Sequence, residues 1–254
     1  MNGEWWETEN LLKSELDQRA SLSADPKSDF GSYRMLLETS DFKKSLIKQH
    51  NELSPIHRTK LLRKLLGPKQ IESVLDIGCG IGITTQALFE TFENASVTGI
   101  DISQDAITYA KSEFRNCVFV CEAVDSESGM KTERYDLICA FEFYPFSRTL
   151  DYDTHLSYTL HLLSLLTPGG CLVIWQRWNN PNSYSVNYEA LRFELSNHRF
   201  ESYQIPLRIV SRFSPLSYKV NLAISKLVRL LMSFLRIQMV ESTHCVIISE
   251  ERND

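Results

Sequence analysis

The sequence predicts an α/β fold built on a doubly wound, mostly parallel sheet. Five strand-like segments alternate with helical ones, a pattern that produces a parallel sheet with helices packed on its faces. The first strand, predicted over Ile71–Leu75, leads into a glycine-rich turn, and an amphipathic helical segment begins at Ile83. Strand, glycine turn and helix in this order bring the backbone close to a nucleotide-like ligand.

The later strands follow from short apolar runs rich in β-branched residues. They are predicted over Val97–Ile100, Cys117–Cys121, Tyr135–Ala140 and Cys171–Trp175, with further strands over Tyr203–Val210 and His244–Glu250. Pro168, Gly169 and Gly170 end the helix that precedes the fifth strand and return the chain to an extended conformation.

The glycine turn reads Asp76-Ile77-Gly78-Cys79-Gly80-Ile81-Gly82. Glycine is needed there because a side chain would block the ligand's approach and because the turn requires positive φ. Dinucleotide sites favour G-x-G-x-x-G/A, but Ile83 stands at the last position of that pattern. The carboxylate of Asp76 would also sit poorly beside a pyrophosphate, so it indicates a ligand that carries positive charge.

The turn resembles motif I of the class I S-adenosylmethionine-dependent methyltransferases, D/E-x-G-x-G-x-G, at every fixed position. The resemblance extends from Val74 to Trp175. It implies a Rossmann-like methyltransferase fold with a seven-stranded sheet whose last strand is antiparallel. It also implies S-adenosyl-L-methionine as the cofactor.

The resemblance also implies where that cofactor is bound. Asp101 follows the second strand at about the 20-residue offset of a ribose-binding acid, although it could instead cap a helix over Ser103–Phe114. Glu122 and Ala123 follow the third strand, where members of the family contact adenine. The full predicted set is Asp76, Gly78, Cys79, Gly80, Gly82, Asp101, Ile102, Glu122, Ala123 and Phe141.

The methyl acceptor is expected beyond the fourth strand, in the segment Phe141-Glu142-Phe143-Tyr144-Pro145-Phe146. It lacks the N/D-P-P-Y/F motif of enzymes that methylate amino groups of nucleobases or glutamine. It resembles the acidic-aromatic segment of small-molecule methyltransferases, but Phe146 stands where that family often has a histidine. The predicted catalytic residues are Glu142, Tyr144 and His155, with a helix cap or surface role as the alternative for His155. Arg177 and Trp178 either bind the acceptor or pack in a loop.

Two segments outside the core are predicted to be helical. Residues 1–68 would form an N-terminal cap on a methyltransferase domain over 69–254. Arg34 there would lie on the solvated face of an amphipathic helix, or Tyr33 and Arg34 would approach the methionyl carboxylate. The insertion over 217–240 carries four basic side chains, and its central apolar run is too short to span a bilayer. It could be a lid over the substrate pocket, a peripheral contact with anionic lipid, or a dimerisation helix.

Composition predicts a cytoplasmic protein. Of the 254 residues, 43% are hydrophobic and 23% are charged, which is ordinary for a globular domain. The net charge of −5 argues against nucleic acid as a partner. The six cysteines form no C-x-x-C pair, so buried reduced thiols are expected and no metal site. The acidic N-terminus is not that of a signal peptide. The oligomeric state stays open.

The sequence therefore predicts methyl transfer to a small-molecule or glycan-like acceptor, at oxygen. One alternative is an NAD-dependent oxidoreductase or epimerase, which Asp76, Ile83 and the absence of a Tyr-x-x-x-Lys pair after the fourth strand oppose. Another is a catalytically inactive, cofactor-binding partner subunit, which the missing histidine at Phe146 favours.

Overall fold

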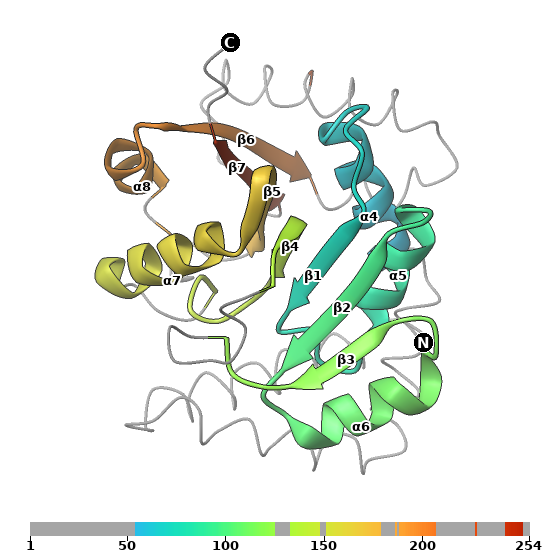
Figure 1. Ribbon diagram of the computed structural model, residues 1–254. Coiled ribbons are helices and arrows are strands. Elements are labelled where there is room, and N and C mark those ends of the chain that lie inside the picture. The colour runs from blue at the N-terminus through green and yellow to red at the C-terminus, as the bar shows by residue number, and fades with distance from the viewer. Residues whose placement is uncertain are drawn as a thin grey trace, which may run out of the picture.

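The computed structural model describes residues 54–124, 133–147, 151–178, 186, 188–206, 227 and 242–250. These residues form one seven-stranded sheet with helices on both faces (Figure 1). The strands are β1 (Ser73–Ile77), β2 (Ser96–Asp101), β3 (Val118–Cys121), β4 (Tyr135–Phe141), β5 (Leu166–Trp178), β6 (His198–Pro206) and β7 (Ser242–Glu250). The helices are α4 (Ser54–Leu65), α5 (Ile83–Thr91), α6 (Gln104–Glu113), α7 (Tyr152–Ser164) and α8 (Tyr188–Glu194).

The strand order is β3-β2-β1-β4-β5-β7-β6, and the order reverses between β1 and β4. Neighbours from β3 to β5 pair in parallel, whereas β7 is antiparallel to both β5 and β6. The predicted fold class is confirmed, including the antiparallel last strand. Because β1 is central, the turn that follows it opens at the carboxyl edge where the strand order reverses, a usual place for a ligand in such sheets.

Several strand boundaries differ from the prediction. The fifth strand begins at Leu166, not at Cys171, so Pro168, Gly169 and Gly170 lie inside β5 and do not end the preceding helix, whose last residue is Ser164. The first strand runs over Ser73–Ile77 and so includes Asp76, which lies in register with Gly99 and Cys139. The sixth strand begins at His198, not at Tyr203, and it pairs with β7 along its whole length to Pro206. Pairing with β7 accompanies the whole length of β6, and the β6 sequence alone carries no information about this partner.

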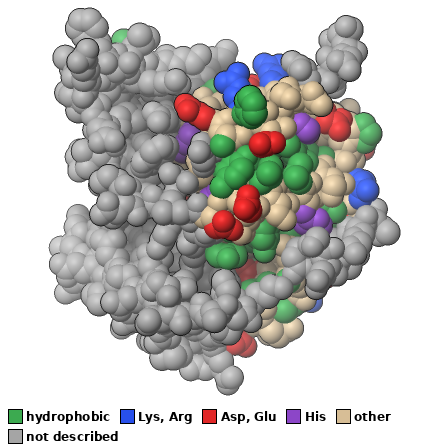
Figure 2. Space-filling model, turned by 90° about the vertical axis from the view of Figure 1, so that its left-hand side faces the viewer, with side chains coloured by type: hydrophobic (Ala, Val, Ile, Leu, Met, Phe, Trp, Pro, Cys, Tyr) green, Lys and Arg blue, Asp and Glu red, His purple; other side chains and the backbone are tan. Residues whose placement is uncertain are grey.

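The sheet buries alternate side chains on its two faces, as the period of a strand requires. One face packs Leu137, Cys139 and Phe141 of β4 against α4 and α5, whereas the other packs Ile138 and Ala140 against α7 and α8. Figure 1 shows these two groups of helices on opposite sides of the sheet. The outer surface of the α7–α8 side mixes acidic, basic and hydrophobic side chains (Figure 2).

Helix starts follow local capping chemistry. The Ser103 hydroxyl accepts a hydrogen bond from the Ala106 amide at 3.3 Å and caps α6. The Asp151 carboxylate accepts from the Thr154 amide at 3.1 Å and caps α7. Helix α4 begins at Ser54 with Pro55 in its first turn, where proline is well tolerated.

The predicted cap over 1–68 is described only from residue 54, so Tyr33 and Arg34 lie outside the described residues. Within the predicted insertion over 217–240, only Leu227 is described, and it is helical. Both segments therefore stay predictions. None of the helices in the described ranges has the length and apolarity that crossing a membrane would require.

Candidate functional site

The glycine turn after β1 has the left-handed backbone that its sequence predicts. Gly78 has φ of 69° and Gly82 has φ of 83°, a region that side-chain-bearing residues rarely adopt. A Cβ atom on Gly78 would also lie 2.7 Å from the Phe143 ring, and one on Gly82 would lie 2.7 Å from the Phe119 ring. Both conformation and space therefore require glycine at these positions.

Hydrogen bonds tie the turn to the end of β2. The amides of Gly78 and Cys79 donate to the Ile100 carbonyl at 2.8 and 3.0 Å. The Asp101 carboxylate accepts from the Gly80 amide at 2.9 Å through one oxygen and from the Ser103 amide at 2.9 Å through the other. Asp101 thus supports the turn and the start of α6 together, although the cap of α6 is Ser103.

Sequence reasoning missed the link between Asp101 and Gly80. The positions could have suggested it, because β1 and β2 are parallel neighbours and Ile77 lies in register with Ile100. Residues that directly follow paired parallel strands meet at the same edge of the sheet. Burial raises the pKa of Asp101, and its hydrogen bonds with backbone amides oppose that shift.

Asp76 lies behind the turn and is almost fully enclosed, with 1% of its surface exposed. The Thr85 hydroxyl of α5 donates to its carboxylate at 2.7 Å. Burial raises the pKa of Asp76 to about 7, and the Asp101 charge adds to the shift, whereas the Thr85 hydrogen bond and the Arg58 charge oppose it. Thr85 is a further residue that sequence reasoning missed.

The third strand end completes this edge of the sheet. Glu122 and Ala123 follow β3, and both are half-buried. The Glu122 amide donates to the Asp101 carbonyl at 3.1 Å, so the backbone of Glu122 lies beside the end of β2. Ile102, which directly follows β2 in the chain, is half-buried.

The predicted acceptor segment leaves β4 with a strained residue. Glu142 is exposed and has φ of 52°, an unusual value for a residue with a side chain. Its amide donates to the Trp175 carbonyl at 2.9 Å, and its carbonyl accepts from the Ser147 hydroxyl at 2.9 Å. These two bonds hold the conformation. Tyr144 is half-buried in the same segment.

Phe141 and Arg58 lie on the α4 side of this segment. Phe141 is 7% exposed and packs in the core, so its side chain leaves little surface that a ligand could contact. The Arg58 guanidinium lies 5.5 Å from the centre of the Phe141 ring and 6.0 Å from that of Trp175, which is the geometry of cation–π contacts. Arg58 was not among the predicted site residues.

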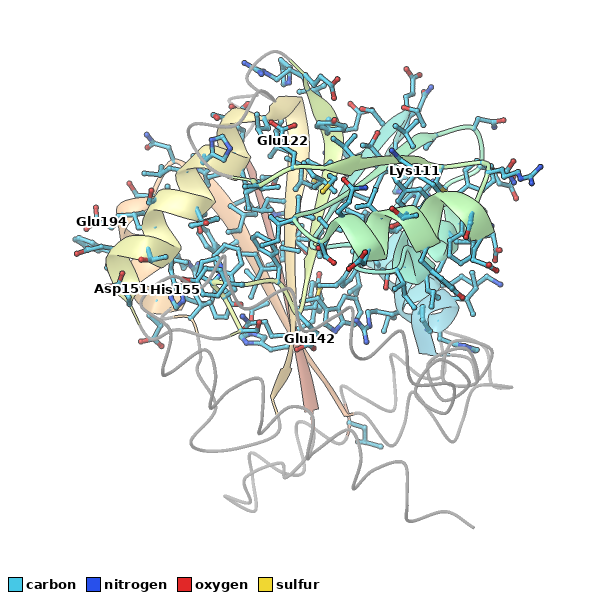
Figure 3. All side chains as sticks on the ribbon, turned by 90° about the horizontal axis from the view of Figure 1, so that it is seen from below. Lys111, Glu122, Glu142, Asp151, His155 and Glu194 are labelled. Atoms are coloured by element: carbon cyan, nitrogen blue, oxygen red, sulfur yellow. The ribbon has the colours of Figure 1, made fainter. Side chains whose placement is uncertain are left out.

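His155 does not lie at the surface and does not cap α7, so the predicted alternative role is wrong. It is 1% exposed, and its Nε2 lies 3.2 Å from the Pro145 carbonyl oxygen. Its ring packs against Phe146 with the centres 5.8 Å apart. Figure 3 shows His155 beside Asp151 at the start of α7, with Glu142 apart from both. The side chains of Arg177 and Trp178 lie outside the described residues.

The cysteines follow the prediction in part. Cys79, Cys139, Cys171 and Cys245 are buried, whereas Cys117 is half-buried and Cys121 is exposed at the end of β3. All six are free thiols. The described ranges hold no cluster of His, Cys, Asp or Glu side chains with the geometry of a metal site.

The arrangement suits a ligand with a diol and a positive charge more than one with phosphates. Asp101 and Asp76 supply only acceptors when ionised, and they would repel a phosphate. The glycine turn lets backbone approach the ligand without side chains in between. The residues present therefore fit the cofactor that the sequence predicts.

Comparison with known proteins agrees with this assignment. Residues 68–204, more than half of the chain, match the family described as "Methyltransferase domain". Trans-aconitate 2-methyltransferase of Escherichia coli O45:K1 is 34% identical over 107 residues, which are 42% of this chain and 39% of that protein. Malonyl-[acyl-carrier protein] O-methyltransferase of Acetivibrio thermocellus is 36% identical over 75 residues, 29% of this chain and 26% of that protein. The chain thus matches about two fifths or less of the length of these relatives.

Solved structures share the fold. The plantazolicin methyltransferase BpumL, solved with a pentazolic desmethylPZN analogue and SAH, superposes with a TM-score of 0.57 at 18% identity, over 94% of this chain and 98% of that one. The N-methyltransferase NodS from Bradyrhizobium japonicum WM9, solved with S-adenosyl-l-homocysteine, has a TM-score of 0.56 at 17% identity, over 88% and 98% of the two chains. On the family match and the sheet order, the chain belongs to the class I methyltransferases, whose cofactor is S-adenosylmethionine.

Proposed function

We propose that this protein transfers a methyl group from S-adenosylmethionine to an oxygen of a small-molecule acceptor. The observation that carries the proposal is the contact between the Asp101 carboxylate and the Gly80 amide at 2.9 Å. It puts an acceptor-only group beside the glycine turn, where both hydroxyls of a ribose could be bound.

The proposed cofactor site extends over four neighbouring strand ends. Gly78, Cys79, Gly80 and Gly82 supply the backbone after β1, and Asp76 supplies negative charge behind it. Asp101 ends β2 and Ile102 follows it, Glu122 and Ala123 follow β3, and Phe141 closes the site at the end of β4. Asp101 would orient the ribose, and Glu122 would accept from the adenine amino group.

An oxygen acceptor is supported by the relatives matched above. One is named for trans-aconitate and another for O-methylation of a malonyl group, and both compounds carry carboxylates. The Arg58 guanidinium at Phe141 supplies positive charge on the side of the site where an anionic acceptor would lie. A glycan-like acceptor stays the other prediction, and it would offer a hydroxyl.

The chain's own contribution to the chemistry is mainly alignment. Methyl transfer from a sulfonium is an in-line displacement with an activated leaving group, so positioning can supply about 7–11 kcal/mol of the barrier reduction. A hydroxyl acceptor needs a base, and Glu142 is the proposed base, with Tyr144 beside the acceptor. His155 is proposed as a positioning residue, because its contacts with Pro145 and Phe146 support the segment that carries Glu142.

Binding and activity test the proposal separately. Calorimetry with S-adenosylhomocysteine should give heat, and NAD should give none; heat with NAD alone would overturn the assignment. Asp101→Ala should weaken S-adenosylhomocysteine at least tenfold, whereas Asp105→Ala, an acid in the first turn of α6, serves as the matched control. Binding without methylation of any candidate acceptor would favour the inactive partner subunit.

Substitution of Glu142 distinguishes the two kinds of oxygen acceptor. Glu142→Gln should lower kcat by about 10²–10⁴-fold if the acceptor is a hydroxyl, because a base is then required. A carboxylate acceptor is already nucleophilic, so the same variant should retain most of its activity.

We also propose a cytoplasmic location, on the composition and charge of the chain.

A further inference from the structure

Two carboxylates lie near the glycine turn in the fold, and their surroundings differ. Asp101 binds the Gly80 amide at the edge of the site. Asp76 lies one layer deeper, 1% exposed, with the Thr85 hydroxyl at 2.7 Å from its oxygen. A buried ionised carboxylate needs compensating charge or several hydrogen bonds, and a single hydroxyl compensates only in part.

The groups that face Asp76 come from every element packed against it. Helix α5 contributes the Thr85 hydroxyl, α4 contributes the Arg58 charge, and the end of β2 contributes the like charge of Asp101. The thiols of Cys79, Cys117 and Cys139 also lie within electrostatic reach of Asp76.

The balance of these groups leaves Asp76 close to its titration midpoint at neutral pH. Burial is the largest influence and raises its pKa to about 7, with the charge of Asp101 adding to it. The same burial raises the pKa of Cys79 and Cys139 well above the physiological range, so both thiols keep their protons. Asp76, unlike these thiols, can therefore change its charge near pH 7.

We propose that Asp76 responds to the charge of the cofactor: it carries a proton in the free protein and releases that proton when a sulfonium ligand occupies the glycine turn. The inference rests on the proposed function and goes beyond it. The O–H bond of the carboxylic acid breaks, its electron pair stays on the carboxylate, and the proton passes to the buffer. A nearby positive charge favours the ionised form, as any opposite charge does.

The consequence is a pH-dependent preference for the methyl donor over the product. Below the titration midpoint, each pH unit should weaken S-adenosylmethionine up to tenfold, because one proton must leave on binding. S-adenosylhomocysteine has a neutral thioether in place of the sulfonium, so its affinity should change less over the same range. Asp76 is thus a positioning residue that helps the protein discriminate substrate from product.

Proton counting tests this directly. Titration of S-adenosylmethionine in buffers of different ionisation enthalpy should show proton release that grows as the pH falls from 8 to 6. S-adenosylhomocysteine should release distinctly less. Asp76→Asn keeps the size of the side chain and an oxygen that accepts from Thr85, and it should abolish the difference between the two ligands.

A second variant separates titration from a merely structural role. Thr85→Val removes the hydrogen bond that lowers the pKa of Asp76, so the pH midpoint of S-adenosylmethionine affinity should move upward. Equal proton release with both ligands, or release that persists in Asp76→Asn, would overturn the inference. Failure of both ligands to bind the wild-type protein would instead overturn the proposed function.

Discussion

Three glycines allow backbone strain and steric overlap to be measured separately. Gly67 has φ of 69° and open space around a Cβ position, so an alanine there meets strain alone. A Cβ on Gly99 would lie 2.9 Å from the Phe119 ring and from the Thr85 hydroxyl, and its φ lies outside the left-handed region, so alanine there meets overlap alone. Gly82 combines φ of 83° with Cβ contacts of 2.7 and 2.8 Å to the Phe119 ring and of 2.9 Å to the Ala110 Cβ.

The expected loss of stability follows from these three situations. A side chain in the left-handed region costs about 1–2 kcal/mol, and an alanine regains about 0.4–1 kcal/mol by restricting the unfolded chain. Gly67→Ala should therefore cost about 1 kcal/mol. Overpacking costs about 1–3 kcal/mol more. Gly82→Ala should thus cost about 2–4 kcal/mol, with Gly99→Ala between the two.

Urea unfolding of the three variants and the wild type measures these free energies. The double variant Gly82→Ala with Phe119→Leu should recover about 1–2 kcal/mol relative to the sum of the single variants, because leucine does not reach the overlapping position. A Gly82→Ala protein as stable as Gly67→Ala, within about 0.5 kcal/mol, would refute the assignment of the overlap to Phe119.

Three further predictions concern the pH dependence of stability at two carboxylates and the predicted catalytic histidine. Because the pKa of Asp76 is raised in the folded state, the ligand-free protein loses stability as pH rises from about 4 to 7. Asp76→Asn should therefore be more stable than the wild type at pH 8 but not at pH 4. Chemical unfolding at the two pH values checks this, and a pH-independent difference would contradict it. The pKa of Asp136 shifts in the opposite direction, because its hydrogen bonds with Thr167, Glu72 and Ser73 outweigh burial and lower it. The stability that Asp136 contributes is therefore present above about pH 4 and disappears as pH falls through the folded-state pKa. The loss of stability caused by Asp136→Asn should accordingly vanish in acid. His155→Ala should lower the free energy of unfolding by about 2–4 kcal/mol, because it leaves a cavity beside Phe146. His155→Gln should restore methylation if the ring only positions the segment that carries Glu142. A His155→Gln protein that is fully stable but inactive would instead show direct catalysis by His155.

The sheet could be predicted because strand, turn and helix each leave a local signal. Alternation of apolar runs indicated the parallel order, and the spacing of Gly78, Gly80 and Gly82 indicated left-handed backbone at the turn. The antiparallel final strand was not a local signal and came only from the family resemblance. The ends of β6 pair with residues of β7 that lie far along the chain, His198 with Glu250 and Pro206 with Ser242, and no local pattern carries that pairing.

The site was predictable to the extent that its residues follow strand ends. Asp101 and Glu122 lie where parallel strands finish, and this placement needs only the strand assignments. Thr85 and Arg58 could not be found in this way, because each reaches the site from the body of a helix. The burial of His155 was missed because its orientation depends on how α7 rotates about its own axis against the segment after β4.

The position of β7 between β5 and β6 has a consequence for synthesis on the ribosome. Among the described strands, β7 is the one that pairs with β6, and it also covers the open edge of β5. Until residues 242–250 emerge, a nascent chain must therefore hold two unpaired strand edges, which are templates for aggregation. The parallel half from β1 to β4 can form earlier, so a stalled chain ending before Ser242 should be a client of chaperones, even with its glycine turn already assembled.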